Sequence, residues 1–114
     1  MNYSVLVADE AIEDIYSLVK YIHKELCNPS AAEKLYRELK EEISNLGAFP
    51  KKFVSTEIRH RGYVIHKKVY KTYLIFYIVN DKEERVYVLR VMKELMHWKK
   101  VLREAKKYHF IRWG

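Results

Sequence analysis

A short basic segment contains the side chains of this sequence that are best suited to chemistry. It contains two histidines and four basic side chains close together in the sequence: Arg59, His60, Arg61, His66, Lys67 and Lys68. Histidine exchanges protons near neutral pH, and lysine does so when burial lowers its pKa. This set could therefore carry out acid–base catalysis. Alternatively, these side chains are solvated groups at a sheet edge, or they contact phosphate and carboxylate groups without chemistry.

A second region, nearer the C-terminus, adds candidates for catalysis or binding. Arg90 lies within an apolar segment, where it either faces a functional surface or pairs with a helix carboxylate such as Glu94 or Glu42. His97 is a further candidate for proton transfer, and Trp98 either fills a junction between sheet and helix or stacks on a nucleic-acid base. The five histidines are scattered and have no cysteine partner, so we expect no metal site and no cofactor.

Charge is distributed unevenly along the chain, whose net charge is +7. Residues 1–50 contain five basic and nine acidic side chains, whereas residues 51–71 contain seven basic side chains and one acidic one. Residues 99–114 contain six basic side chains and one acidic one. Such basic blocks indicate a surface for an anionic partner, although a solvated face that maintains solubility has the same composition.

Length and composition limit the classes of protein to which the chain can belong. A chain of 114 residues, 49% of them hydrophobic, is sufficient for one compact domain over residues 1–114. Cys27 is the only cysteine, so no disulfide can form within the chain and we expect a reducing, cytoplasmic location. We expect no membrane association, because the longest apolar run is far shorter than the ~20 residues of a spanning helix.

Two helices are predicted in the first half of the chain. After a short strand at residues 3–7, Asp9 can cap a helix whose apolar residues recur at steps of three and four. Ser30 and Glu33 form a capping box for a second helix, and Gly47 is its expected C-terminal glycine. The short link between them predicts an antiparallel helical hairpin.

Three strands and a third helix are predicted in the second half. Residues 57–70 form one strand with a β-bulge at Gly62, and residues 73–79 and 85–92 form the next two. The uncharged middle strand is expected to be buried on both faces, by the helices on one side and by further chain on the other. A helical pattern begins at about Glu94. We therefore expect an α+β fold with the order β-α-α-β-β-β-α, in which the hairpin packs on a small, mostly antiparallel sheet.

Four segments of the sequence follow one another in an order and at a spacing typical of one protein family. They are AIEDIYSLVKYIHKEL, NPSAAEKLYRELKEEISNLGAFP, TYLIFYIV and VYVLRVMKELMHW. The series resembles the RelE/ParE superfamily of toxins from type II toxin–antitoxin systems, over about residues 3–102, and is closer to the ParE-like branch. The resemblance implies a small antiparallel sheet curved around a helical hairpin, in agreement with the pattern of apolar residues.

The resemblance also implies partners. A toxin of this kind serves plasmid stabilisation and is neutralised by a cognate antitoxin, which is usually small and acidic and folds as it binds, giving a toxin–antitoxin hetero-oligomer. RelE-like and YoeB-like relatives cut messenger RNA on the ribosome, whereas ParE-like relatives are associated with inhibition of DNA gyrase. A third alternative is a non-toxic, basic relative that binds nucleic acid.

The central strand favours the ParE-like branch. Ribonuclease relatives place an arginine directly after the first aromatic residue of this strand, where this chain has Leu74. Glu94 stands where RelE-like members have a basic residue, and Lys100 stands near the position of their tyrosine. The ending KYHF (Lys107–Phe110) resembles the RYHY of YoeB-like members, but it follows an extra helix and its last ring has no hydroxyl.

We therefore expect a toxin that binds a macromolecule, DNA gyrase, and does not act as an enzyme. The side chains expected to contact the target or the antitoxin are Arg59, Arg61, Lys67, Lys68, Arg90 and Trp98. If the protein is a ribonuclease instead, its candidate catalytic residues are Arg61, His66, Lys67, Lys68, Arg90 and His97. Residues 108–114 form either a flexible tail or a segment that folds back over the sheet.

Overall fold

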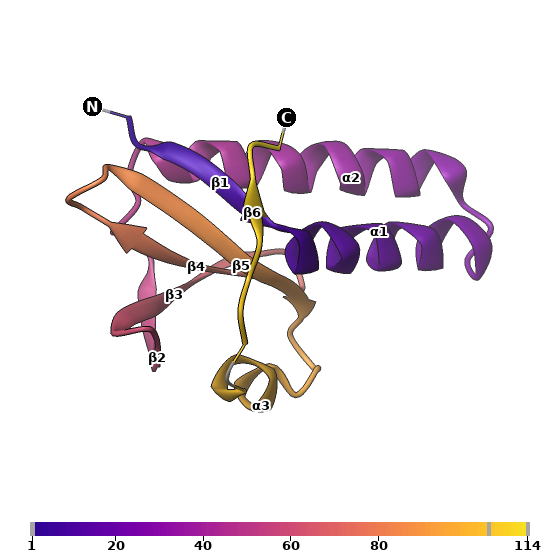
Figure 1. The fold of residues 1–114 in the computed structure, drawn as a ribbon. Coiled ribbons are helices and arrows are strands. Elements are labelled where there is room, and N and C mark those ends of the chain that lie inside the picture. The colour runs from indigo at the N-terminus through magenta and orange to yellow at the C-terminus, as the bar shows by residue number, and fades with distance from the viewer. Residues whose placement is uncertain (1, 105, 114) are drawn as a thin grey trace.

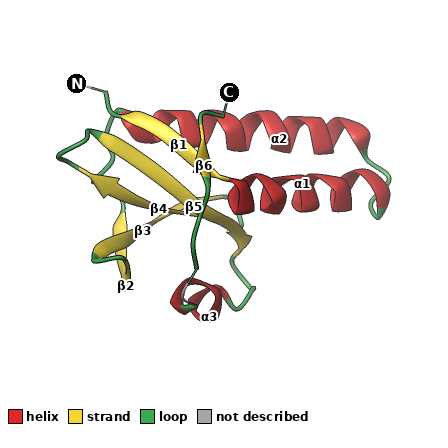
Figure 2. Ribbon diagram, in the orientation of Figure 1, coloured by secondary structure: helices red, strands yellow, loops and turns green. Residues whose placement is uncertain are grey.

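The fold combines a helical hairpin with a sheet, in a computed structural model that describes residues 2–104 and 106–113. The strands are β1 (Ser4–Ala8), β2 (Val54–His60), β3 (Tyr63–Tyr70), β4 (Tyr73–Asn80), β5 (Arg85–Lys93) and β6 (Phe110–Ile111). The helices are α1 (Asp9–Lys24), α2 (Pro29–Ser44), the 3-10 helix η1 (Asn45–Gly47) and α3 (Trp98–Arg103). Over the described residues the strands form one six-stranded sheet in the order β2-β3-β4-β5-β1-β6 (Figures 1 and 2). The α+β prediction is confirmed.

Both long helices form where apolar periodicity predicts them, but their ends differ from the prediction. Asp9 is the first residue of α1 and not its cap, because the helix follows β1 directly after Ala8. The capping box predicted at the start of α2 is also wrong, because the side chain of Asn28 accepts a hydrogen bond from the Ala31 amide at 3.1 Å. Gly47 lies within η1, where a Cβ atom would approach the carbonyl oxygen of Tyr3 to 2.4 Å.

The long strand predicted for residues 57–70 is wrong. The chain forms two antiparallel strands, β2 and β3, joined by a turn at Arg61 and Gly62 with φ angles of 51° and 86°. Gly62 is therefore a turn residue and not a bulge. The irregularity lies earlier, between Ser55 and Arg59. Because the chain reverses at the turn, side-chain direction cannot be counted through it as along a single strand.

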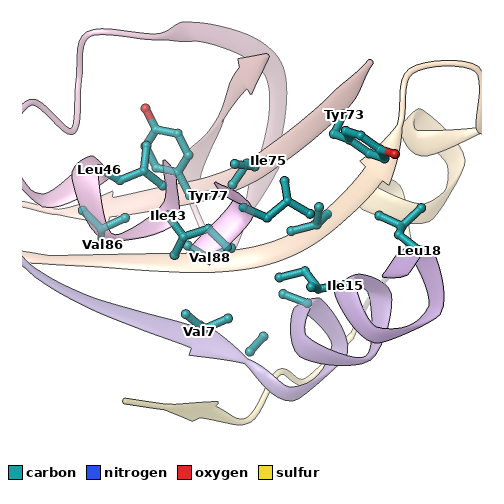
Figure 3. Close-up of a cluster of buried hydrophobic side chains, with 14 of the residues drawn as sticks. Val7, Ile15, Leu18, Ile43, Leu46, Tyr73, Ile75, Tyr77, Val86 and Val88 are labelled. Atoms are coloured by element: carbon teal, nitrogen blue, oxygen red, sulfur yellow. The ribbon is translucent and has the colours of Figure 1, made fainter. Parts of the chain in front are cut away.

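The central strand β4 is buried on both faces, as predicted. Tyr73, Ile75 and Tyr77 face the helical hairpin and pack with apolar side chains of α1, α2 and β5 (Figure 3). The alternate residues point to the opposite face, where Leu74 and Phe76 belong to a second apolar cluster together with other strands and α3. The uncharged run in the sequence is thus a strand between two apolar layers.

The C-terminal segment covers this second face. α3 begins at Trp98, later than the predicted start near Glu94, and the chain then crosses the sheet to the outer edge of β1 (yellow in Figure 1). There β6 pairs antiparallel with β1, and the Asp9 amide donates a hydrogen bond to the carbonyl of His109 at 2.9 Å. Of the two alternatives for residues 108–114, the described part folds back. In residues 2–104 and 106–113, no helix has the length and apolar character needed to cross a bilayer.

A cationic groove as the candidate functional site

A groove of about 540 Å³ lies between the β2–β3 turn and the segment that follows α3. We call it the cationic groove; its lining residues are Arg59, His60, Arg61, Leu102, Arg103, Glu104, Lys106 and Lys107. Five of these side chains are lysine or arginine and one is a carboxylate. The fold thus joins parts of the two basic blocks of the sequence into one surface.

Apolar packing positions the walls of the cationic groove. Leu102 of α3 is only 4% exposed and belongs to the same apolar cluster as Ile58 of β2, which docks the helix on the edge strand. On the facing wall, the side chain of Arg59 donates a hydrogen bond to the Gly62 carbonyl at 2.9 Å and braces the turn. The buried leucine and the turn therefore fix the backbone, while the charged side chains project into solvent at the rim.

The electrostatics of the cationic groove leave positive charge available to a ligand. Within residues 2–104 and 106–113, Arg61, Arg103 and Lys107 form no ion pair with a carboxylate, and Lys106 approaches Glu10 only at 3.9 Å. Burial, and then the charge of Arg61, lower the pKa of His60 below its usual value of 6.5. His60 is therefore mainly neutral at pH 7 and presents a polar group without adding charge.

An aromatic ring packs against His60, one of the lining residues of the cationic groove. The ring of Tyr108 lies 5.1 Å from that of His60 and nearly perpendicular to it, and burial raises the pKa of the tyrosine hydroxyl. Tyr108 comes from the ending that resembles YoeB-like toxins. The next residue, His109, points elsewhere and contacts Asp9 on α1, with Nδ1 and Oδ2 3.1 Å apart.

A second hollow, of about 640 Å³, continues the positive surface along α3 and shares Arg103 and Glu104 with the cationic groove. The ring of Trp98 packs at 5.1 Å from that of Phe76 in the sheet, so it fills the junction between sheet and helix. The ammonium groups of Lys67 and Lys99 lie 5.2 and 5.5 Å from the centre of the Trp98 ring. His97 also lines this hollow and is exposed.

The lysines and histidines predicted for acid–base chemistry are not brought together. Lys68 is buried beneath α2, where its ammonium group lies 3.3 Å from the Glu42 carboxylate and donates to the Glu42 carbonyl. His66 lies on the same face of the sheet and its Nδ1 is 3.1 Å from the carbonyl oxygen of Phe53. Lys67 is on the opposite face, over α3. The set is therefore divided between the two faces of the sheet.

Arg90 is held by a carboxylate of α1. Its Nε and one terminal nitrogen donate to the two Asp14 oxygens at 2.7 and 2.8 Å, and the hydrogen bond raises the pKa of the guanidinium. Asp14 also accepts from the Val91 amide at 3.0 Å, beyond the point where β1 pairs with β5. The arrangement agrees with the structural alternative for Arg90, although the partner is neither Glu94 nor Glu42.

The position at which the resemblance to RelE-like ribonucleases implies an arginine is part of the apolar core. Leu74 is 2% exposed and packs in the cluster beneath α3 that includes Ile65, Met92 and Leu102. This position of the central strand therefore offers a ligand neither a positive charge nor an accessible side chain. In the described residues, no three histidine, cysteine, aspartate or glutamate side chains are grouped closely enough to hold a metal ion.

Three cations of the cationic groove were missed by sequence reasoning: Arg103, Lys106 and Lys107. These three residues belong to the basic block at residues 99–114, which was identified in the sequence by its charge alone. Its location beside the β2–β3 turn depends on the docking of α3 through Leu102, which charge composition cannot reveal.

Comparison with known proteins gives one family match. The model of the family described as the ParE toxin of the type II toxin–antitoxin system parDE matches residues 5–98. No curated protein matches the chain.

Solved structures share the fold. The chain is 21% identical to a structure from the RelBE2 toxin–antitoxin complex of Mycobacterium tuberculosis, with a TM-score of 0.54, and the match covers 82% of this chain and 92% of that one. It is 20% identical to a structure from the archaeal RelE–RelB complex of Pyrococcus horikoshii, with a TM-score of 0.57 and coverage of 83% and 98%. It is 17% identical to a mutant of the E. coli toxin RelE in the free state, with a TM-score of 0.58 and coverage of 90% and 95%.

Proposed function

The chain belongs to the ParE toxin family of type II toxin–antitoxin systems, and from this premise we propose that it acts by binding DNA gyrase and not by cutting RNA. The observation that carries the proposal is the burial of Leu74 beneath α3, at 2% exposure. A ribonuclease of this superfamily would need a cation there to stabilise the charge that builds on the phosphorane. Here that position faces leucine, isoleucine and methionine side chains.

Arg90 supports the same proposal. Arg90 is a cation of β5 that could replace the missing one, but its Nε and one terminal nitrogen donate hydrogen bonds to Asp14. Moving Arg90 to a substrate would leave the carboxylate of Asp14, which is only 16% exposed, without its partner. Such a loss is costly in a partly buried site. The accessible cations are instead those of the cationic groove, which suits electrostatic binding of a macromolecule.

The toxin pairs with a cognate antitoxin, and we propose that the antitoxin docks in an apolar groove of about 420 Å³ between α1 and β5. Apolar side chains that line it include Leu18, Tyr21, Met92 and Met96. Two of these side chains are strongly exposed, Tyr21 at 49% and Met96 at 48%. Large apolar side chains left exposed next to a groove are the usual anchors of a protein interface.

A second candidate function is RNA cleavage at the cationic groove. His60 is mainly neutral at pH 7 and could accept a proton, and Arg61 beside it could stabilise an anion. This arrangement differs from that of the ribonuclease relatives, because it lies at the β2–β3 turn and not on the central strand.

Expression in cells without the antitoxin tests the proposal. Gyrase inhibition predicts induction of the DNA-damage response and an accumulation of gyrase covalently attached to cleaved DNA. Messenger RNA cut at defined codon positions would contradict the proposal and favour the second candidate. The variant His60→Ala separates the two mechanisms, because it should abolish RNA cleavage at the cationic groove and leave the gyrase effect largely intact.

A further inference from the structure

The cationic groove has more positive charge than a single small anion would neutralise. Its five cations face one carboxylate, and Arg61, Arg103 and Lys107 have no carboxylate partner among the described residues. The positive surface continues into the hollow along α3, which adds Lys99 and Lys100. A ligand that matches this surface must carry several negative charges in a row, as a polymer of phosphates or carboxylates does.

The groove lacks the apolar recess that an acidic peptide would need. Its one apolar lining residue, Leu102, is 4% exposed and already packed in the core. Affinity in protein interfaces comes largely from large side chains that fill desolvated pockets. Such a surface exists elsewhere on this molecule, in the groove between α1 and β5. The cationic groove offers charge without these anchors, which favours nucleic acid over a polypeptide.

The aromatic side chains near the groove favour a duplex over a single strand. Proteins that bind single strands stack bases on open aromatic faces. Here the Trp98 ring packs against Phe76 and lies beneath the ammonium groups of Lys67 and Lys99. Tyr108 is partly buried and contacts the ring of His60 edge to face. These rings are already occupied, so a ligand meets mainly cationic side chains, which contact phosphates regardless of base sequence.

We propose that the cationic groove binds the phosphodiester backbone of double-stranded DNA, without sequence specificity. The inference rests on the proposed function, because gyrase holds duplex DNA, and it adds that the toxin contacts this DNA as well as the enzyme. The contact is electrostatic, so its affinity falls steeply with salt as counterions are released from the DNA.

The test uses fluorescence anisotropy to measure binding of the purified toxin to a labelled DNA duplex over a series of salt concentrations. The duplex has about 20 base pairs, a length sufficient for one non-specific site. The test variant carries Arg61→Ala, Arg103→Ala and Lys107→Ala, which remove three exposed cations of the groove. The control variant carries Lys20→Ala, Lys24→Ala and Lys34→Ala on the helical hairpin, where the side chains are also exposed. Both variants have the same net charge, and equal unfolding midpoints establish that both are folded.

The wild type and the control should bind the duplex with the same salt dependence. In the test variant, the slope of log K against log salt should become shallower by about 2 to 3, and affinity near 0.1 M salt should fall at least ~10-fold. Equal losses in the two variants would overturn the proposal, because binding would then follow net charge and not the groove. Tighter binding to a single strand, or to an acidic peptide, would also overturn it.

Gyrase supercoiling assays on the same proteins distinguish this inference from the proposed function. A wild type that inhibits gyrase but does not bind duplex DNA through the groove would refute the inference and leave the function standing. A wild type that binds duplex through the groove and leaves gyrase unaffected would refute the proposed function and support the DNA site alone.

Discussion

Replacing Asp14 by asparagine tests whether Arg90 is a structural residue. The substitution preserves the size of the side chain but removes the charge that holds the guanidinium. Arg90 is 18% exposed and Asp14 16%, and two hydrogen bonds of 2.7 and 2.8 Å join them. The Val91 amide also loses a charged acceptor. We expect Asp14→Asn to destabilise the protein while the contacts of the cationic groove remain.

The magnitude follows from the burial of the pair. Leaving a fully buried charge without its partner costs about 3–5 kcal/mol. Because both side chains retain some contact with water, we expect a loss of about 2–3 kcal/mol in the free energy of unfolding. With a urea m-value of about 1–3 kcal/mol/M for a small domain, the unfolding midpoint should fall by about 0.7–3 M.

Equilibrium urea unfolding, followed by far-UV circular dichroism, measures this change. The control is Asp9→Asn, which removes a carboxylate from an exposed contact with His109 and should cost less than about 1 kcal/mol. The double variant Asp14→Asn/Arg90→Met should recover part of the loss, because it no longer contains an unpaired charge.

The reasoning would be refuted if Asp14→Asn shifted the midpoint no more than Asp9→Asn does. It would also be refuted if Arg90→Met alone preserved stability but abolished toxicity. In either case Arg90 would have a functional role, and the absence of a cation at Leu74 would no longer argue against catalysis.

Three other predictions follow from the burial and packing of single side chains. Leu74→Ala should lower the free energy of unfolding by about 2–4 kcal/mol in a urea titration, because the side chain is buried beneath α3. The control Val69→Ala, at an exposed site, should change this free energy by about 0.5 kcal/mol or less. Combining Tyr21→Ala with Met96→Ala should weaken antitoxin binding at least ~10-fold by calorimetry, since buried interface anchors contribute about 1–2 kcal/mol or more each; unchanged affinity would place the antitoxin elsewhere. NMR titration should give the His60 imidazole a pKa below 6.5, because the ring is partly buried and lies near Arg61. As the pH falls through 6.5, the imidazole therefore takes up a proton more readily in the unfolded chain than in the folded one. This difference lowers the free energy of unfolding.

Much of the fold could be predicted because burial leaves a periodic pattern. The apolar steps of three and four residues placed both long helices, and the uncharged run at residues 73–79 correctly identified a strand covered on both faces. The β2–β3 turn could not be separated from a bulge, because a glycine with positive φ is compatible with both. Arg61 also adopts a positive φ of 51°, for which an arginine gives no signal.

The candidate site was only partly predictable, because it depends on contacts between distant parts of the chain. Asp14 and Arg90 are separated by 76 positions, and their pairing depends on where α1 crosses β5. Sequence charge identified two basic blocks but could not show that α3 docks one beside the other. Successive residues of a strand point to opposite faces, so the strand prediction already separated Lys67 from Lys68. It could not show that Lys68 lies beneath α2 and Lys67 over α3.

The most direct test of binding against cleavage uses the purified toxin in two reconstituted assays. The first measures gyrase supercoiling and the accumulation of cleaved DNA complexes, and the second measures cleavage of transcripts in a translating extract. Our account predicts gyrase inhibition that weakens in the groove variant Arg61→Ala/Arg103→Ala/Lys107→Ala, and intact transcripts. Codon-positioned cleavage of the transcripts that disappears on His60→Ala, with gyrase unaffected, would contradict it.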